Sequence, residues 1–290
     1  MAEAPIIDIV NLEKRYRSKN TDVFALQGIN LAINKGDIFG VIGKSGAGKS
    51  TLVRCINMLE RPTGGSIFFE GKDMCRLSES ELRAARRSMG MIFQQFNLLQ
   101  QRTALQNICF PLEIAGTSKV DAEKRARELL EIVGLSDRAD NYPSQLSGGQ
   151  KRRVAIAGVI AMRPDVLVLD EPTAGLDPAG RDEIFELVRS YHKQSGATIL
   201  IVSHSMEDIA QVADRLLVMN HAKVLFCDTP REVFSHADEI IAAGLDIPMI
   251  TKVMLELKKR GHDVDTSVYT VAQAMDALRA CKWKEAAHEC

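Results

Sequence analysis

The sequence contains no long hydrophobic run, no excess of charge of one sign and no closely spaced cysteine pair. No stretch reaches the roughly eighteen apolar residues that a membrane-spanning helix needs, so no such helix is predicted. Lysine and arginine number 37 against 38 acidic residues, a net charge of -1, which argues against generic nucleic-acid binding. The six scattered cysteines, and the lack of a signal-peptide pattern in MAEAPIIDIV, favour a cytoplasmic protein with reduced thiols.

Hydrophobic residues make up 46% of the 290 positions and charged residues 26%, as in ordinary folded proteins. Three nearly continuous apolar runs, DIFGVIG, VLVLDEP and ATILIVSH, are typical of strands that are buried on both faces. Because helical patterns separate these runs, the sequence predicts an α/β fold with a mostly parallel sheet. The neighbouring segments RLLVMN and KVLFCD predict a hairpin at its end.

Two stretches are helical with no strand between their helices. Residues 103–135 are rich in Ala, Glu, Leu and Arg and break near Gly116, which predicts two helices inserted into the α/β core. From about Arg231 onward, apolar residues recur at helical spacing, which predicts a helical C-terminal segment. A shorter helix over residues 78–87 begins with the capping-box pattern SESE.

A glycine-rich segment between a buried strand and a helix carries the clearest chemistry. GKSGAGKS fits the pattern GxxxxGK[ST] of a phosphate-binding loop, whose glycines let backbone amides converge on phosphate oxygens. Lys49 is predicted to neutralise the β- and γ-phosphates, and the Ser50 hydroxyl to bind Mg²⁺. The predicted ATP-binding residues of this segment are Gly43, Lys44, Ser45, Gly46, Ala47, Gly48, Lys49, Ser50 and Thr51.

Two adjacent carboxylates follow the strand VLVLD. Asp170 is predicted to hold Mg²⁺ through water, and Glu171, whose carboxylate points the other way, to polarise an attacking water. Taken alone, an Asp-Glu pair after a strand is more often a solvated helix-capping pair. The phosphate-binding loop upstream favours the catalytic interpretation.

The pentapeptide LSGGQ is the signature by which the sequence resembles the ATP-binding cassette (ABC) ATPases. The resemblance covers roughly residues 5–235 and includes the other motifs of that family in order. The matching residues are Tyr16 for adenine stacking, Gln94 of the Q-loop, Ser147, Gly148, Gly149 and Gln150 of the signature, Asp177 of the D-loop and the switch histidine His204. Each also has a structural interpretation: Tyr16 can be a core aromatic, Gln94 a polar strand-end residue and His204 a hydrogen-bonded structural histidine.

The resemblance implies a fold and two cofactors. The fold is a P-loop nucleotide-hydrolase core with a mostly parallel sheet, an antiparallel β subdomain and an inserted helical subdomain at about residues 95–145. A C-terminal helical extension at 236–290 follows the ATPase domain. ATP and Mg²⁺ are the implied cofactors. The implied magnesium ligands are Ser50, Gln94 and Asp170, and the implied catalytic residues are Glu171 and His204.

Within the family, the sequence resembles two branches of prokaryotic importer ATPases. GKSGAGKSTLVRCINMLERPT and GMIFQQFNLL are similar to methionine-type amino-acid importers. RRVAIAGVIAMRPDVLVLDEPTAGLDP and AAGLDIPMITKVMLELKKRG are similar to energy-coupling factor transporters, which take up vitamins and metal ions. Ala157-Gly158-Val159 stands where many cassettes have Ala-Arg-Ala. The chain is also expected to lack the C-terminal regulatory domain of the methionine type, and a hybrid origin, natural or artificial, is a hypothesis.

The function implied is that of an ATP-hydrolysing subunit that energises a prokaryotic nutrient importer. In this family the signature and Asp177 act on the nucleotide of the other subunit, so activity implies a homo- or heterodimer. The further partners are transmembrane permease subunits at the cytoplasmic face of the membrane, with no nucleic acid. The alternative left open is a cytosolic ABC ATPase that acts without a membrane partner, as a switch or assembly factor.

Three residues near the end of the sequence are candidates for a second metal site. Cys281, His288 and Cys290 are all possible zinc ligands. Three ligands without a clear fourth make a poor zinc site, so an exposed tail is the favoured interpretation.

Overall fold

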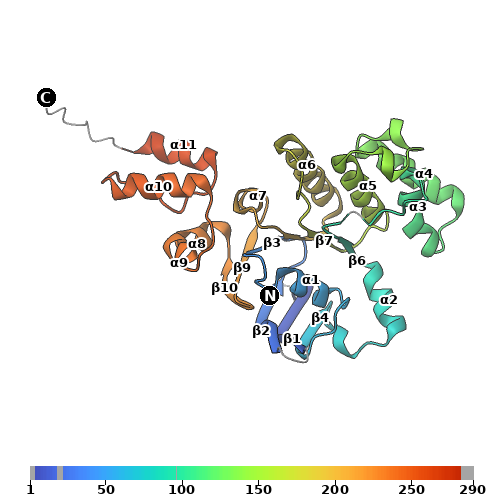
Figure 1. Cartoon of the computed structure of the whole chain (residues 1–290), viewed down its shortest axis with the longest axis horizontal. Helices are drawn as coiled ribbons and strands as arrows, with labels where there is room; N and C mark the ends of the chain where they lie inside the picture. The colour runs from blue at the N-terminus through green and yellow to red at the C-terminus, as the bar shows by residue number, and fades with distance from the viewer. Residues whose placement is uncertain (1–3, 18–21, 96, 282–290) are drawn as a thin grey trace.

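A six-stranded sheet runs through the middle of the molecule in the order β10-β9-β3-β8-β7-β6 (Figure 1). The computed structural model describes residues 4–17, 22–95 and 97–281. The strands of this sheet are β3 (Ile38–Gly43), β6 (Met89–Ile92), β7 (Val166–Asp170), β8 (Thr198–Val202), β9 (Arg215–Asn220) and β10 (Lys223–Asp228). All but β10 are parallel to their neighbours, and β10 pairs antiparallel with β9. The mostly parallel sheet and its terminal hairpin are therefore confirmed.

The continuous apolar runs are explained by burial on both faces of this sheet. In β3, Ile38 and Ile42 belong to one hydrophobic cluster, whereas Phe39 and Val41 belong to the other. Because successive side chains of a strand point to opposite faces, a strand covered on both sides must be apolar at every position. The helices α5 (Gly148–Ile160), α6 (Pro178–Ser195) and α7 (Met206–Ala210) cover one face, and α1 (Lys49–Ile56) covers the other (Figure 1).

A second, antiparallel sheet lies on the α1 side of the core. Its order is β2-β1-β4-β5, with β1 at Ile7–Arg17, β2 at Asp22–Ile33, β4 at Gly64–Phe69 and β5 at Lys72–Asp73. A short 3-10 helix, Met74–Arg76, then leads to α2 (Glu79–Arg87). The Ser78 side chain accepts from the backbone amide of Glu81, whose carboxylate accepts from the amide of Ser78, so the predicted capping box is present.

The inserted helices form a lobe at one end of the long axis of the molecule (Figure 1). They are α3 (Ala104–Ile114) and α4 (Lys119–Ile132), followed by the 3-10 turns Ser136–Arg138 and Pro143–Gln145. The predicted break near Gly116 lies between α3 and α4. Since α3 packs against both α4 and α5, the lobe is joined to the core through the helix that begins at the signature.

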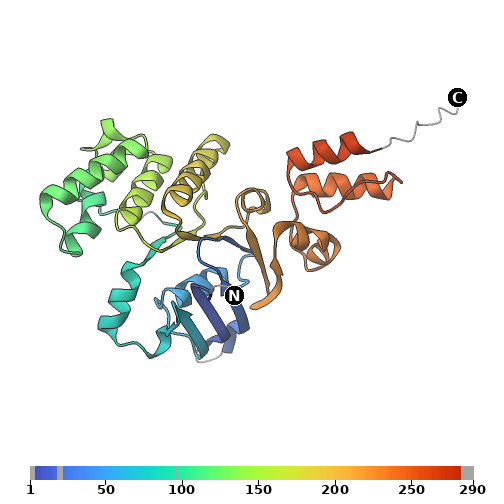
Figure 2. The same cartoon turned by 180° about the vertical axis from the view of Figure 1, so that it is seen from behind.

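The C-terminal helices lie at the opposite end of the molecule from this lobe (Figure 2). They are α8 (Pro230–Ser235), α9 (Ala237–Ala242), α10 (Met249–Lys259) and α11 (Val271–Ala280). Phe234, Ile240 and Ile247 are buried in the same hydrophobic cluster as one face of the central sheet. The α10–α11 pair has a small core of its own, around Met254 and Val268. Packing with the ATPase core therefore continues beyond residue 235, to about Ile247.

The structure bears on the expectations about membrane-spanning helices, cysteines and a zinc site, within the residues that it describes. None of its helices combines the length and the apolar character that crossing a bilayer requires. Cys55, Cys75, Cys109, Cys227 and Cys281 are all free thiols. Of the proposed zinc ligands, His288 and Cys290 lie outside the described residues, and within those residues no cluster of three or more His, Cys, Asp and Glu side chains suits a metal ion.

Candidate nucleotide-binding and hydrolysis site

The phosphate-binding loop leaves the carboxyl end of β3 and leads directly into α1. Gly48 occupies the N-cap of α1 with a φ of 103°, in the left-handed region that favours glycine. A Cβ at this position would collide with the backbone oxygen of Ala25. Gly48 supplies no capping side chain, so the first amides of α1 face an approaching phosphate.

Lys49 is the first residue of α1 and is buried against this loop. Its ammonium donates to the carbonyl oxygens of Gly43, at 2.7 Å, and of Lys44, at 3.0 Å. Burial lowers the pKa of Lys49, while the nearby charges of Glu171 and Asp170 act in the opposite direction. The loop thus holds a positive charge where the phosphates would lie. Lys44, by contrast, reaches the C-terminal end of α9, where a side chain at Gly244 would collide with its ammonium.

Ser50 and Asp170 meet at the end of β7. The Ser50 hydroxyl donates to Oδ1 of Asp170 across 3.4 Å. Burial and the adjacent Glu171 raise the pKa of Asp170, because its negative charge is poorly solvated there. A hydroxyl and a carboxylate oxygen are donors that Mg²⁺ prefers, so these two side chains fit the implied cation. When bound, Mg²⁺ would supply positive charge that offsets the negative charge of the phosphates.

Gln94 is the third predicted magnesium ligand. It follows β6, which pairs in parallel with β7, so it leaves the sheet at the same edge as Asp170. Its side chain is exposed, and among the described contacts it makes no hydrogen bond to Ser50 or Asp170. The structure therefore brings two of the three predicted ligands together, and Gln94 stays a predicted ligand.

Glu171 and His204 face each other beyond Asp170. Nδ1 of His204 lies 2.8 Å from Oε2 of Glu171. The Glu171 side chain is 13% exposed and that of His204 is 71% exposed, so the carboxylate is sheltered and the imidazole open to solvent. Glu171 has a φ of 52°, a strained conformation for a residue with a side chain. Its amide is held by the carbonyl of Val202, at 2.9 Å, which fixes the carboxylate at the strand ends.

Tyr16 lies on β1 close to the first turn of α1. Its hydroxyl donates to the Glu60 carboxylate, and the Lys14 ammonium lies 5.2 Å from the centre of its ring. Burial and the bond to Glu60 raise the pKa of Tyr16, while a hydrogen bond to Thr51 partly offsets this. Since Lys14 covers the ring and Glu60 fixes its hydroxyl, the ring is held in one orientation beside the phosphate-binding loop.

A substitution series at Tyr16 tests whether this ring is the adenine platform. We expect Tyr16→Ala to weaken MgATP binding about tenfold, because base–aromatic stacking contributes about 1–3 kcal/mol. Tyr16→Phe keeps the ring and loses only the hydrogen bonds of the hydroxyl to Glu60 and Thr51, so its Kd for MgATP should stay within about twofold of the parent. Titration of the purified chain with a fluorescent ATP analogue measures both. An unchanged Kd for MgATP in Tyr16→Ala would show that the ring does not bind adenine and has a structural role only.

The signature residues lie at the start of α5. Ser147 caps this helix and exchanges hydrogen bonds with Gln150, through the Ser147 amide at 2.9 Å and the Gln150 amide at 3.2 Å. Ser147 and Gly148 are exposed, and α5 lies on the opposite side of the central sheet from α1 (Figure 1). Asp177 is also exposed and caps α6 through the amide of Gly180. Within one chain, the signature therefore stands apart from the phosphate-binding loop.

Sequence reasoning missed Glu60 and Arg152. Glu60 is invisible in the sequence because its contact with Tyr16 spans 44 positions. Arg152 is 1% exposed, and its guanidinium donates to the carbonyls of Phe93 and Gln94. A signal for it existed: helical spacing places Arg152 on the same face as the buried Ala155 and Ile156, where a charge is unexpected.

Known proteins share extended sequence similarity with this chain. Residues 26–174 match the family model described as "ABC transporter". The chain is 47% identical over 250 residues to methionine import ATP-binding protein MetN 3 of Pectobacterium atrosepticum, covering 84% of this chain and 73% of that protein. MetN of Escherichia coli matches with the same identity and the same shares of both chains. The chain therefore belongs to the ATP-binding cassette family of transporter ATPases, which are ATP hydrolases.

Two solved structures are similar to this chain in three dimensions. The dimeric ATP-binding cassette MJ0796, in a post-hydrolysis state with ADP and Pi, is 32% identical, with a TM-score of 0.72 over 77% of this chain and 98% of that chain. CbiO1 from Clostridium perfringens, part of the complex cbiONQ, is 34% identical, with a TM-score of 0.74 over 89% of this chain and 98% of that chain. The ABC ATPase fold is confirmed. Both sequence resemblances also have counterparts, in MetN and in CbiO1, while the hybrid origin stays a prediction.

Proposed function

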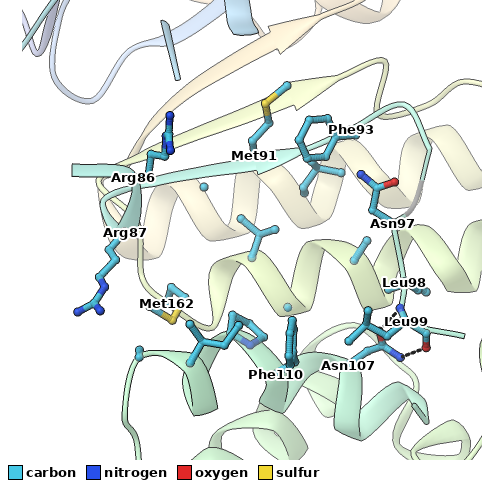
Figure 3. A pocket seen from close by; sticks show the side chains of 18 of the residues that line it. Arg86, Arg87, Met91, Phe93, Asn97, Leu98, Leu99, Asn107, Phe110 and Met162 are labelled. Carbon is cyan, nitrogen blue, oxygen red and sulfur yellow. Dashed lines mark hydrogen bonds between the residues drawn. The ribbon is translucent and has the colours of Figure 1, made fainter. Parts of the chain in front are cut away.

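We propose that this chain energises a prokaryotic nutrient importer as a dimer, bound through permease subunits at the cytoplasmic face of the membrane. Its relatives are named for methionine import, and CbiO1 for an ABC transporter complex. These names favour transport over a membrane-free switch. The observation on this chain that carries the proposal is an apolar groove between the sheet edge and the helical lobe (Figure 3).

The groove has a volume of about 510 Å³ and a largely hydrophobic lining. Figure 3 shows its floor and walls, to which Met91, Phe93, Leu98, Phe110 and Met162 contribute. Apolar surface of this extent suits the apolar face of an amphipathic helix. We infer that a cytoplasmic helix of the permease binds here, since β6 and the segment that follows it line the groove, beside the Q-loop.

One wall of the groove is held in place before any partner binds. The buried side chain of Asn107 accepts from the Leu99 amide at 2.7 Å and donates to the Leu99 carbonyl at 3.1 Å (Figure 3). The rim carries the exposed Arg83 and Arg87. A partner helix with acidic residues beside its apolar face would therefore complement both the floor and the rim.

Both halves of the sequence line this groove. The earlier half contributes the segment after β6 and α3, which has methionine-importer character. The later half contributes Gly158, Val159 and Met162 of α5 and the turn after it. Gly158 stands where many cassettes have arginine, and a Cβ there would lie in ordinary contact with the α3 backbone, 3.6 Å from the carbonyl oxygen of Asn107. Phe96, an apolar residue of the segment FQQFNLL that follows β6, lies outside the described residues.

Exchange of the segment Gln94–Leu135 for that of an energy-coupling factor ATPase tests which surface selects the permease. We expect the parent chain to be recruited to membranes by a methionine-type permease and the exchanged chain to shift toward the energy-coupling factor permease, because specificity follows the desolvated anchors of an interface. The C-terminal helices are expected to bias pairing between ATPase subunits instead. The measurement is co-sedimentation of the tagged chain with membranes that contain either permease.

Gly158→Arg tests how this position affects the choice of permease. Arginine is a better helix former than glycine, so α5 should form normally. Because many cassettes carry arginine here, we expect membrane recruitment to shift between the two permease types and not to be lost, with nucleotide binding unchanged. The segment exchange described above also has an outcome that contradicts the proposal. If the parent chain binds only the energy-coupling factor permease and the exchange changes nothing, the helical lobe does not select the partner.

A further inference from the structure

Arg152 is a buried cation on α5, close to the segment that follows β6 and to the two carboxylates at the end of β7. It lies on α5, five residues after the signature serine, and its Nη1 and Nη2 donate to the carbonyl oxygens of Phe93, at 3.1 Å, and Gln94, at 3.2 Å. Burial lowers the pKa of the guanidinium, and the charges of Asp170 and Glu171 raise it. A buried charge is costly unless its partners are well placed, which suggests that the position has a function.

The two carbonyls belong to the segment that connects β6 to the groove wall. Strand β6 is fixed at the sheet edge by its pairing with β7 from Met89 to Ile92. Immediately after Ile92, the chain turns away from the sheet, and the Arg152 fork binds two consecutive carbonyls there. A planar guanidinium spans two such acceptors with a fixed geometry, which a lysine ammonium does not.

We propose that Arg152 is a positioning residue that ties the backbone at Phe93 and Gln94 to the signature helix, so that Gln94 follows α5 when that helix moves. This inference rests on the proposed role of Gln94 at the magnesium site. The two hydrogen bonds of Arg152 act just beyond Ile92, the last residue of β6 that pairs with β7, so the sheet does not hold the backbone there. A shift of α5 therefore changes the position of Gln94 relative to Ser50 and Asp170. A helix bound in the groove against α5 thereby acts on the hydrolysis site.

Turnover measurements on the full chain test the effect of the tether on the reaction. Arg152→Gln removes the charge and the fork, and we expect kcat to fall about tenfold while the Kd for MgATP stays within about twofold. Arg152→Lys keeps the charge without the fork and should give an intermediate kcat. Lys151→Gln removes the same charge from the neighbouring position and should leave kcat unchanged. An Arg152→Gln chain with parental kcat, or with lost MgATP binding, would overturn the proposal.

A double-mutant cycle separates this role from a general effect on the site. If Arg152 acts through Gln94, adding Arg152→Gln to Gln94→Ala should lower kcat by less than about twofold more. Effects that multiply would show that Arg152 acts elsewhere, and the proposal would fail. A Gln94→Ala chain with parental kcat would instead contradict the proposed role of Gln94, and with it the catalytic part of this inference.

Hydrogen exchange without nucleotide tests the tether independently of hydrolysis. In Arg152→Gln, the peptide that follows Ile92 should exchange several-fold faster than in the parent and in Lys151→Gln, while the later turns of α5 keep their rates. Unchanged exchange after Ile92 would show that no tether exists. Faster exchange throughout α5 together with a lower Tm would assign Arg152 to the stability of the helix, which also overturns the proposal.

Discussion

Glu171→Gln is expected to lower ATP turnover about 10²-fold or more and to retain MgATP binding. The carboxylate is sheltered and the Glu171 amide, which donates to the Val202 carbonyl, fixes the residue next to Asp170, so the carboxylate can accept a proton from a water aligned on the γ-phosphate. Glutamine has nearly the same shape but cannot take up that proton. Lys49, Ser50 and Asp170 remain to bind the nucleotide, so only the chemical step is lost. Steady-state ATPase rates and MgATP titration of the same preparation measure the two effects.

The same variant should form a more stable dimer in the presence of MgATP, because unhydrolysed nucleotide stays between the two subunits. Size-exclusion chromatography with and without MgATP measures this. Glu207→Gln is the matched control: it removes a nearby carboxylate and keeps an acceptor for the Met249 amide, which the Glu207 carboxylate binds at 3.0 Å. Near-normal ATPase activity in Glu171→Gln would remove this residue from the mechanism.

Two inactive variants are expected to restore hydrolysis when they are mixed. Lys49→Ala disables the phosphate-binding loop, and Ser147→Asp places a negative charge at the signature while still capping α5. Each variant alone should lose ATPase activity about 10²-fold. Lys49→Ala removes the positive charge that faces the phosphates, and the Ser147→Asp carboxylate repels the phosphate of the partner's nucleotide. If the signature serves the partner's nucleotide, a mixed dimer contains one site in which both surfaces are intact. Mixing should then recover a substantial fraction of the parental rate.

This complementation separates action between subunits from action within one chain. Ser118→Asp makes the same exchange at the N-cap of α4 and should leave the ATPase rate unchanged, which controls for the added charge. The ratio of the two chains is varied at constant total concentration, and the rate should pass through a maximum near equal amounts. A mixture no more active than its components would contradict an arrangement in which the signature acts on the other subunit.

The residues that could be assigned from the sequence depend on local backbone geometry. Gly48 is required because the loop needs a positive φ at the start of α1, and Lys49 and Ser50 follow it at fixed spacing. The apolar strands β3, β7 and β8 were equally predictable, since a strand buried on both faces tolerates few polar residues. The two lobe helices and the break near Gly116 follow from the same periodicity arguments.

The extent of the C-terminal packing was less predictable. The sequence resemblance suggests a boundary near residue 235, yet Ile240 and Ile247 pack in the main cluster, while Met254 belongs to a separate small core. Helical spacing shows that a face is apolar, but it does not show which neighbour covers that face. The boundary in packing therefore emerged only from the three-dimensional arrangement.

By itself, the sequence determined the class of chemistry, because phosphate loop, carboxylates and signature are each encoded by a few neighbouring residues. The tertiary structure decided how these parts meet: His204 beside Glu171, the Tyr16 hydroxyl on Glu60, and the groove built from both halves of the chain. It also placed Arg152 on two backbone carbonyls. Every residue carries a carbonyl, so no side-chain pattern marks which ones a distant guanidinium will bind.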